Sequence, residues 1–347
     1  MKILYSFNKK GFEAEYWTRE ILSASNDEIE FVPFNHGSYL EPNRYLRAQL
    51  LDNLYFRREP GLLALYAAIE ARLRETKADV LFVDNCPPYH PEFLRTLDVY
   101  KALRICDGPT TAYDRDFAYL HAYDHIFYHS RAYSSDLTMP EKLAYCGAAR
   151  TSFWPLAVFD AFCDPDLSED AVFRIPKIHD IVFVGAIYPE KMEFLANISR
   201  EYGSRFQIFG LTNWKKNLYF NTRYGARKWV RPLDFSSYKS VYQRAKIGIN
   251  AHLRGKYTVG NYRMFDLPAN GVLQVTDGGE YVEDFFAPGT EIETYDTGEE
   301  AMAKIEHLLS NPSQREEIAR GGFRRAMRDH RIAKRLRDLR PVLAASL

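Results

Sequence analysis

The chain contains a series of short apolar runs, each separated from the next by a segment whose apolar residues recur at helical spacing. Runs such as DVLFVD (79–84) and DIVFVG (180–185) are apolar at nearly every position instead of alternating with polar residues. A strand of this kind has to be covered on both faces, as in a parallel sheet with helices on either side. The sequence therefore predicts an α/β protein built on parallel sheets.

The same pattern gives approximate bounds for the elements. Strands are expected at residues 3–7, 29–34, 79–84, 103–107, 125–130, 148–156, 180–185, 205–210, 246–252, 271–277 and 290–296. Helices are expected at residues 13–23, roughly 42–75, 189–203, 236–245 and most of 299–347. Ser236 is the expected N-cap of the fourth helix.

A chain of 347 residues is longer than one hydrophobic core usually serves, and the pattern of strands and helices breaks once. The segment DAFCDPDLSEDAVFRIPK, which follows Phe159, is acidic and interrupted by proline, as linkers often are. We expect two doubly wound, Rossmann-like domains facing a deep cleft. The expected boundaries are 1–160 for the N-terminal domain, 161–178 for the linker, 179–330 for the C-terminal domain and 331–347 for a final helix.

The charge and the apolar content of the sequence exclude some classes of function. The formal net charge is +0, so no global field draws the protein to nucleic acid or to a membrane. No run approaches the roughly 18 apolar residues of a membrane span, and MKILYSFNKK enters a strand instead of an apolar signal segment. Four widely spaced cysteines without a Cys-x-x-Cys pair are typical of reduced thiols. A cytoplasmic protein is expected.

The common nucleotide and hydrolase motifs are missing. The sequence has no GxxxxGK[ST] loop, no GxGxxG after the first strand, and neither GxSxG nor HExxH. Two Asp-x-Asp triplets, at 114–116 and 164–166, could hold a divalent metal on a diphosphate, but the second lies in the expected linker. We predict no metal site and no cofactor.

Ligands of doubly wound sheets bind beyond the carboxyl ends of the strands, so the residues that follow each strand are the candidates for a site. In the second half, small residues follow two strands at Gly185 and Gly210, where backbone amides can approach a ligand. Residues 205–256 are rich in Lys and Arg, with Asp234 as their only acid. Most of these side chains are expected on a solvated face, whereas Arg254, Lys256 and Arg263 are candidates for the rim of an anion site.

Three stretches of the second half carry a family resemblance: DIVFVGAIYPEKMEFL, PLDFSSYKSVYQRAKIGINAH and the block from NYRMFDLPANGVLQVTDGG to REEIARGG. Over about residues 180–330 they resemble the C-terminal half of GT-B glycosyltransferases, in particular the CgeB-like, or spore-maturation-type, branch and the C-terminal domain of glycosyltransferase families 1 and 4. The first half is similar more loosely, through ADVLFVDNCPPYHPEFL and RICDGPTTAYDRDF. The resemblance implies that the final helix crosses back onto the N-terminal domain.

The resemblance also implies a donor site, in which a nucleoside diphosphate sugar is held mainly by the C-terminal domain. The diphosphate loop corresponds to residues 257–262, with backbone amides near Val259, Gly260 and Asn261 and a charge-assisted bond from Arg263. Asp266 falls where related retaining enzymes place the carboxylate that binds the ribose hydroxyls. The earlier acidic residue of the family falls at Thr258, a departure that leaves the stereochemical outcome open. The loop after Gly185 adds Tyr188 and Lys191, and the nucleobase is expected near 209–214, beside Gly210.

The acceptor hydroxyl must give up its proton during sugar transfer. If the reaction inverts configuration, a carboxylate or imidazole takes it, and Asp107, directly after a predicted strand, is our first candidate, with Asp84, His36 and His90 as alternatives. If the reaction retains configuration, a donor phosphate oxygen can serve instead.

The predicted function is a metal-independent glycosyltransferase that uses a UDP-, GDP- or similar sugar. Its acceptor is a glycan, a protein or another polymer, with nucleic acid as a variant that the basic stretch 215–231 favours slightly. Two alternatives stay open at this point: a nucleotide-sugar epimerase or hydrolase on the same fold, and a non-catalytic protein that binds nucleotide sugars.

Overall fold

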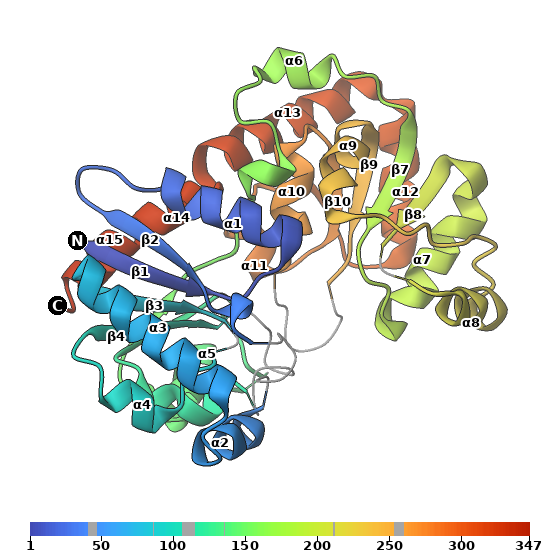
Figure 1. Cartoon of the computed structure of the whole chain (residues 1–347). Coiled ribbons are helices and arrows are strands. Elements are labelled where there is room, and N and C mark those ends of the chain that lie inside the picture. The colour runs from blue at the N-terminus through green and yellow to red at the C-terminus, as the bar shows by residue number, and fades with distance from the viewer. Residues whose placement is uncertain (41–46, 86, 106–114, 135, 211, 253–259) are drawn as a thin grey trace. The chain divides into compact units, whose positions relative to one another are not determined.

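The computed structural model describes residues 1–347 except 41–46, 86, 106–114, 135, 211 and 253–259. It divides into two compact units, each built on a fully parallel sheet (Figure 1). Unit 1 comprises Met1–Pro155 together with Ile332–Leu347, and unit 2 comprises Leu156–Arg331. The predicted α/β class with two parallel sheets is confirmed, and each expected strand corresponds to a strand of the structure.

The sheet of unit 1 has the strand order β2-β1-β3-β4-β5-β6. Its strands are β1 (Lys2–Phe7), β2 (Glu30–Asn35), β3 (Val80–Asp84), β4 (Tyr100–Ile105), β5 (His125–Tyr128) and β6 (Thr151–Phe153). The connecting helices are α1 (Gly11–Ser23), η1 (His36–Ser38), α2 (Ala48–Phe56), α3 (Pro60–Thr76), α4 (Pro91–Arg95), η2 (Phe117–Ala122) and α5 (Met139–Tyr145). All five residues of β3 are buried, as its apolar run predicts.

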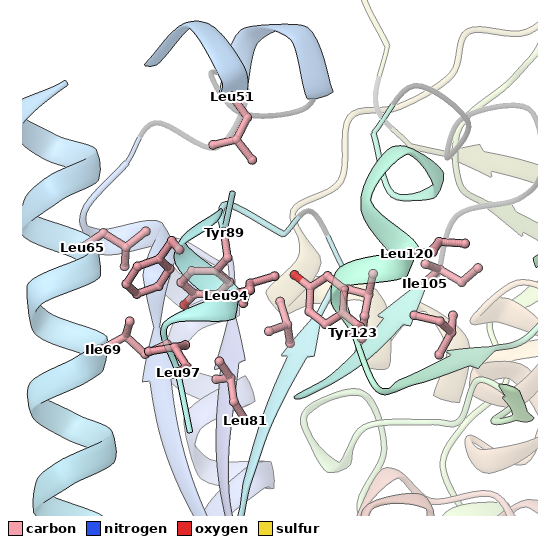
Figure 2. Close-up of a cluster of buried hydrophobic side chains, with 14 of the residues drawn as sticks. Leu51, Leu65, Ile69, Leu81, Tyr89, Leu94, Leu97, Ile105, Leu120 and Tyr123 are labelled. Carbon is pink, nitrogen blue, oxygen red and sulfur yellow. The ribbon is translucent and has the colours of Figure 1, made fainter. Parts of the chain in front are cut away.

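One side of this sheet is covered by a cluster that Figure 2 shows in detail. Leu65 and Ile69 of α3 face Leu81 of the sheet, and the ring of Tyr89 lies between α3 and Leu94. Residues one turn apart on a helix share a face, which is why this spacing in the sequence leads to a packed layer. One layer of the core of unit 1 therefore lies between α3 and the sheet, and Tyr5 packs against Trp17 of α1 in another.

Two local predictions in the helices are wrong. The helix expected over roughly 42–75 is divided into α2 and α3, because Arg58 takes a left-handed backbone conformation with φ of 53° and Pro60 starts a new helix. Ser236 does not cap the fourth expected helix. It lies in a 3₁₀ turn, and the helix begins at Tyr238 after Ser237, which makes no side-chain capping bond.

The sheet of unit 2 has the order β11-β10-β9-β7-β8. Its strands are β7 (His179–Val184), β8 (Phe206–Phe209), β9 (Ala245–Asn250), β10 (Leu273–Asp277) and β11 (Glu293–Tyr295). Its helices are η3 (Asp160–Phe162), α6 (Glu169–Phe173), α7 (Pro189–Tyr202), η4 (Gly203–Arg205), α8 (Trp214–Tyr224), η5 (Phe235–Ser237), α9 (Tyr238–Gln243), α10 (Arg263–Ala269), α11 (Glu280–Glu283), α12 (Gly298–Ser310) and α13 (Pro312–Asp329). The chain order reverses between β7 and β9, so the topological switch point of this sheet lies there.

Residues 161–178, the expected linker, lie within unit 2 and include α6, whose Val172 is buried. Glu169 of α6 binds Arg320 and Arg324 of α13 at 3.0 and 2.8 Å. The end of the chain forms α14 (Ile332–Arg337) and α15 (Leu339–Ala344), which belong to unit 1, and α14 contacts α1.

Candidate functional site

The switch point of the second sheet is bridged by one side chain, Arg263. Its Nε donates to the carbonyl of Val184, the last residue of β7, at 2.6 Å, and its Nη1 donates to Oδ1 of Asn250, the last residue of β9, at 2.9 Å. The guanidinium lies over the ring of Phe183, 4.4 Å from its centroid. Arg263 is therefore built into the carboxyl edge of the sheet, at the place where ligands of such sheets bind.

Asn250 joins this bridge to the start of α10. Its buried Oδ1 also accepts a hydrogen bond from Nδ2 of Asn261 at 2.9 Å, and Asn261 in turn caps the first turn by accepting from Met264 N at 3.1 Å. Arg263 and Asn261 thus share one acceptor, which fixes the entry into α10 relative to β9. Asn261 and Arg263 were predicted from the sequence as site residues, whereas Asn250 was missed.

The loops after β7 and β8 approach each other closely, and glycine is required at both. A Cβ on Gly210 would lie 2.1 Å from the carbonyl oxygen of Gly185, and a Cβ on Gly185 would lie 2.0 Å from Nη2 of Arg263. Real Cβ atoms do not come this near to other atoms, so neither position accepts a side chain without moving the loop or the arginine. The two predicted glycines thus let the guanidinium rest on the backbone of the β7 loop.

A second cation lies beside Arg263. Lys191, in the first turn of α7, is buried, and among the described residues its Nζ has no hydrogen-bond or ion-pair partner. Its burial, and next the charge of Arg263, lower the pKa of Lys191 to about 8, while Asp277 acts in the opposite direction. Tyr188, exposed at the cap of α7, has its ring 6.0 Å from this Nζ. Among the described residues, these two cations therefore have no ion-pair partner at this edge.

The nearby carboxylate, Asp277 at the end of β10, is already engaged. It accepts hydrogen bonds from the backbone N of His252 at 2.9 Å and from Nδ1 of the same residue at 2.7 Å. Burial raises the pKa of Asp277, but the bonds from His252 outweigh burial and hold it below its ordinary value. With Nδ1–H donated to Asp277, the buried Nε2 of His252 has no hydrogen-bond partner in the described part of the chain. Neither residue was assigned a role from the sequence.

Asp266 lies one turn after Arg263 on α10, and it is buried instead of on the helix surface, with an exposed fraction of 6%. Burial raises the pKa of its carboxyl to about 8, and Arg263 offsets only part of this effect. Its Oδ1 has no hydrogen-bond partner among the described residues. The carboxyl group is therefore a buried acid with one oxygen that the described residues leave unsatisfied, and the assignment to the ribose hydroxyls stays a prediction.

Of the remaining predicted donor residues, only some lie among the described residues. Gly260 lies against Tyr281 of α11, where a Cβ would come 2.1 Å from the ring, so close packing alone accounts for glycine there. Thr258 and Val259, like the rim candidates Arg254 and Lys256, lie outside the described residues. The structure thus brings together Gly185, Gly210, Lys191, Asn261 and Arg263.

The base candidates of the first half are described in part, since Asp107 lies outside the described residues. Asp84 forms a buried ion pair with Arg104 at 2.8 Å, and Arg104 stacks on Trp154, so Asp84 serves the packing of unit 1. The Nδ1 of His36 lies 2.8 Å from Ser6 Oγ.

His90 is held by Asp52 at 3.1 Å and stacks on Tyr55. At the carboxyl ends of β1 and β2, unit 1 has a cavity of about 490 Å³, whose lining includes Lys9, Asn35 and Glu59.

A model of the family described as "Glycosyl transferase-like" matches residues 191–340, which cover most of unit 2 and continue into α14 and α15. The search of curated proteins gives no significant match. The match begins at Lys191 and includes every residue of the carboxyl edge described above except Phe183, Val184 and the loop that follows them.

Solved structures of low sequence identity share the fold over the whole chain. Sucrose-phosphate synthase from Thermosynechococcus elongatus is 14% identical with a TM-score of 0.61, and each chain is covered completely. HepE from Anabaena, solved in complex with UDP-glucose, is 12% identical with a TM-score of 0.63, again with complete coverage of both chains. A putative UDP-N-acetylglucosamine 2-epimerase from Listeria monocytogenes is 11% identical with a TM-score of 0.56, over 99% of this chain and 95% of that one.

The shared fold confirms the predicted α/β architecture of the GT-B type, and the family match gives residues 191–340 as a glycosyl transferase-like region. The CgeB-like branch within that class remains a prediction. Among the helices of the described residues, none combines the length and the apolar character needed to cross a membrane.

Proposed function

We propose that the protein transfers a sugar from a nucleoside diphosphate donor to a hydroxyl or other nucleophile of a polymer acceptor, as a CgeB-like glycosyltransferase. One observation carries this proposal. Lys191 and Arg263 meet at the switch point of the second sheet, and Lys191 is buried there without an anionic partner among the described residues. A buried cation is costly unless an anion accompanies it, and a diphosphate supplies that anion.

In the proposed reaction, the bond between the anomeric carbon and the diphosphate oxygen breaks, and the electron pair leaves with the diphosphate. Lys191 and the guanidinium of Arg263 stabilise the charge that develops on the leaving group. The acceptor oxygen bonds to the anomeric carbon, and its proton passes to a base or to a donor phosphate oxygen. Asp107 is the proposed base for an inverting reaction. We propose that the step needs no metal or cofactor.

The nucleotide is proposed to bind with its ribose at Asp266 and its phosphates at Lys191, Arg263 and the loop that contains Gly260 and Asn261. HepE in its complex with UDP-glucose supports a UDP-sugar donor. The acceptor is proposed to bind unit 1, where the cavity beyond β1 and β2 is lined by charged and polar side chains. We also propose that the protein acts in the cytoplasm.

The test of the donor site is a thermal-shift panel of UDP, GDP, ADP and their sugar conjugates, because a ligand that binds only the folded state raises the melting temperature. At least one nucleotide is expected to raise it. Asp266→Ala and Arg263→Ala are expected to reduce the shift, with Lys216→Ala, on the exposed side of α8, as the control. If no nucleoside diphosphate changes the melting temperature, the proposed function is wrong.

A turnover assay separates the proposal from the two alternatives. A transferase consumes its donor only when an acceptor is present, an epimerase or hydrolase consumes it without acceptor, and a binding protein consumes none. Treatment with EDTA is expected to leave the rate unchanged. A rate that EDTA removes and Mg²⁺ or Mn²⁺ restores would contradict metal independence and leave the transferase proposal standing.

A further inference from the structure

Unit 2 carries an unusual set of exposed apolar side chains on and beside α8. Within sixteen residues of sequence, four large side chains face solvent: Trp214, Leu218, Tyr219 and Trp229, with exposed fractions of 62%, 46%, 47% and 56%. Scattered exposed apolar residues are normal, but a group of this size on one element marks a contact site. We call these four residues, with the cations around them, the α8 surface.

The α8 surface is a rigid unit, because two asparagines attach the segment 228–230 to the helix. Asn217 accepts from Val230 N at 2.8 Å, and Asn221 accepts from Lys228 N and donates to Lys228 O, both at 2.9 Å. Asn217 and Phe220 are buried beneath the helix, which packs against α7 (Figure 1). Trp229 is therefore held beside the helix that presents Trp214.

Trp214 and Leu218 are four residues apart on α8 and lie one above the other. Tyr219 lies about 100° further around the helix than Leu218, and Lys215 lies between the two. The Nζ of Lys215 is 5.7 Å from the ring of Trp214. The exposed side of α8 therefore combines apolar side chains with a cation among them.

The charge of the segment that forms the α8 surface is entirely positive. Residues 214–231 contain Lys215, Lys216, Arg223, Arg227, Lys228 and Arg231 and no aspartate or glutamate, although the whole chain has a formal net charge of +0. In the described part of the chain, none of these six cations forms an ion pair. The glycosyltransferase function proposed above uses none of them.

We propose that the α8 surface docks onto an anionic membrane surface as a peripheral contact. Trp and Tyr side chains favour the boundary between headgroups and acyl chains, and Lys and Arg side chains extend from there to lipid phosphates. We favour a lipid over a nucleic acid because the exposed aliphatic side chain of Leu218 gains from the acyl region and gains little from phosphates.

The test is co-sedimentation of the full chain with vesicles of neutral phosphatidylcholine, alone or with about a third phosphatidylglycerol. Binding is expected to the anionic vesicles and to fall about tenfold or more between about 50 and 500 mM salt, because screening weakens the electrostatic part. The tryptophan emission is expected to shift to shorter wavelength with the anionic vesicles only.

Two pairs of substitutions test the apolar and the electrostatic contributions to vesicle binding separately. Trp214→Ser with Trp229→Ser removes the aromatic anchors, and Lys215→Glu with Lys216→Glu reverses two charges; each is expected to weaken vesicle binding by about tenfold or more. The matched controls lie on unit 1, at exposed positions: Phe56→Ser with Tyr145→Ser, and Arg57→Glu with Arg74→Glu. The controls are expected to bind as the unchanged protein does. All these side chains are exposed, so melting temperatures within about 2 °C are expected throughout.

Several outcomes would overturn the proposal. These are equal binding to neutral and anionic vesicles, binding that both α8 pairs leave unchanged, and binding to single-stranded RNA or DNA with none to vesicles. A dimer in solution that Trp214→Ser with Trp229→Ser dissociates, without vesicle binding, would show that a second copy of the chain covers this surface. None of these results depends on nucleotide binding, so the donor site and the α8 surface can fail separately.

Discussion

Two buried ionisable groups dominate the carboxyl edge of the second sheet, and both are shifted toward their neutral forms. Burial lowers the pKa of Lys191 and raises that of Asp266. An ionisable group that stabilises the fold usually has partners that favour its charged form, and these raise the pKa of a lysine and lower the pKa of an aspartate. These two residues therefore weaken the free protein, which is the usual signature of groups retained for a ligand.

Asp266 makes the stability of unit 2 depend on pH in a direction opposite to that of a salt-bridged carboxylate. Its pKa is about 8 in the folded protein against an ordinary value of 3.8, so between these values the folded state binds one proton more than the unfolded state. The contribution of this group to the free energy of unfolding is largest below about pH 4. It falls by about 1.4 kcal/mol per pH unit as the pH rises toward 8. Asp266→Asn is expected to remove this slope in urea unfolding measured from pH 5 to pH 8.

The quantity to compare is the change of the unfolding free energy with pH. Its absolute value is less informative, because the new amide can shift it at every pH by about 1–3 kcal/mol. Asp27→Asn, at an exposed position of unit 1, is the control and is expected to leave the slope unchanged. If Asp266→Asn and the unchanged protein lose stability in parallel over this range, the carboxyl is not buried as the structure shows.

Lys191→Met is expected to have opposite effects on stability and on binding. At pH 7 the buried ammonium costs the folded state up to about 3 kcal/mol, since its pKa falls from 10.5 to about 8. The substitution is expected to raise the melting temperature of the free protein and to abolish the rise that a nucleoside diphosphate produces. The difference in unfolding free energy between the variant and the unchanged protein is expected to narrow between pH 8 and 10.5, because Lys191 loses its proton at lower pH in the folded state than in the unfolded state. A variant that is less stable and still responds to nucleotide would refute the role given to Lys191.

At the scale of elements, the carboxyl edge is assembled from loops that only glycine can form. Gly210→Ala is expected to destabilise unit 2 by about 3 kcal/mol or more, because its Cβ would lie 2.1 Å from the Gly185 carbonyl and would separate the β7 and β8 loops. Gly203→Ala is the matched control: Gly203 also has positive φ, 52°, but no atom lies within 4 Å of its added Cβ, so about 1 kcal/mol is expected. Urea unfolding measures both, and equal losses would contradict a clash at Gly210.

The strands were predictable from the sequence because strands buried on both faces leave continuous apolar runs, such as that of β7. The division of α2 from α3 was missed: Arg58 gives no signal for its left-handed conformation, but Pro60, where α3 begins, is a local signal of a helix boundary. Gly185, Gly210, Lys191 and Arg263 were identified by their position after strands and by the family resemblance. Asn250 and the pair of His252 with Asp277 were missed, because their contacts join strands far apart in the sequence.

The two units are not simply successive segments of the chain, because residues Ile332–Leu347 at the C-terminal end complete unit 1. Trp154 of unit 1 donates from Nε1 to the carbonyl of Arg335 at 2.8 Å, and α14 contacts α1. The residues of these last helices that are buried are Ile332, Ala333, Arg335, Leu336, Leu339 and Leu343. The family model ends at residue 340, within α15 and beyond the end of unit 2.

Removal of residues 332–347 is therefore expected to destabilise unit 1 and leave unit 2 intact. Ile332, Leu336, Leu339 and Leu343 are fully buried, and each contributes about 1.5–3 kcal/mol. Their combined loss is comparable to the roughly 5–15 kcal/mol by which a domain is stable. Hydrogen exchange of the chain 1–331 is expected to show lost protection in β1 and α1 and unchanged protection in β7 and β9. The same truncation is expected to keep the nucleotide-induced stabilisation of unit 2, because the residues proposed to bind the donor all lie within Leu156–Arg331. Loss of protection in both sheets would show instead that the terminal helices stabilise the two units together.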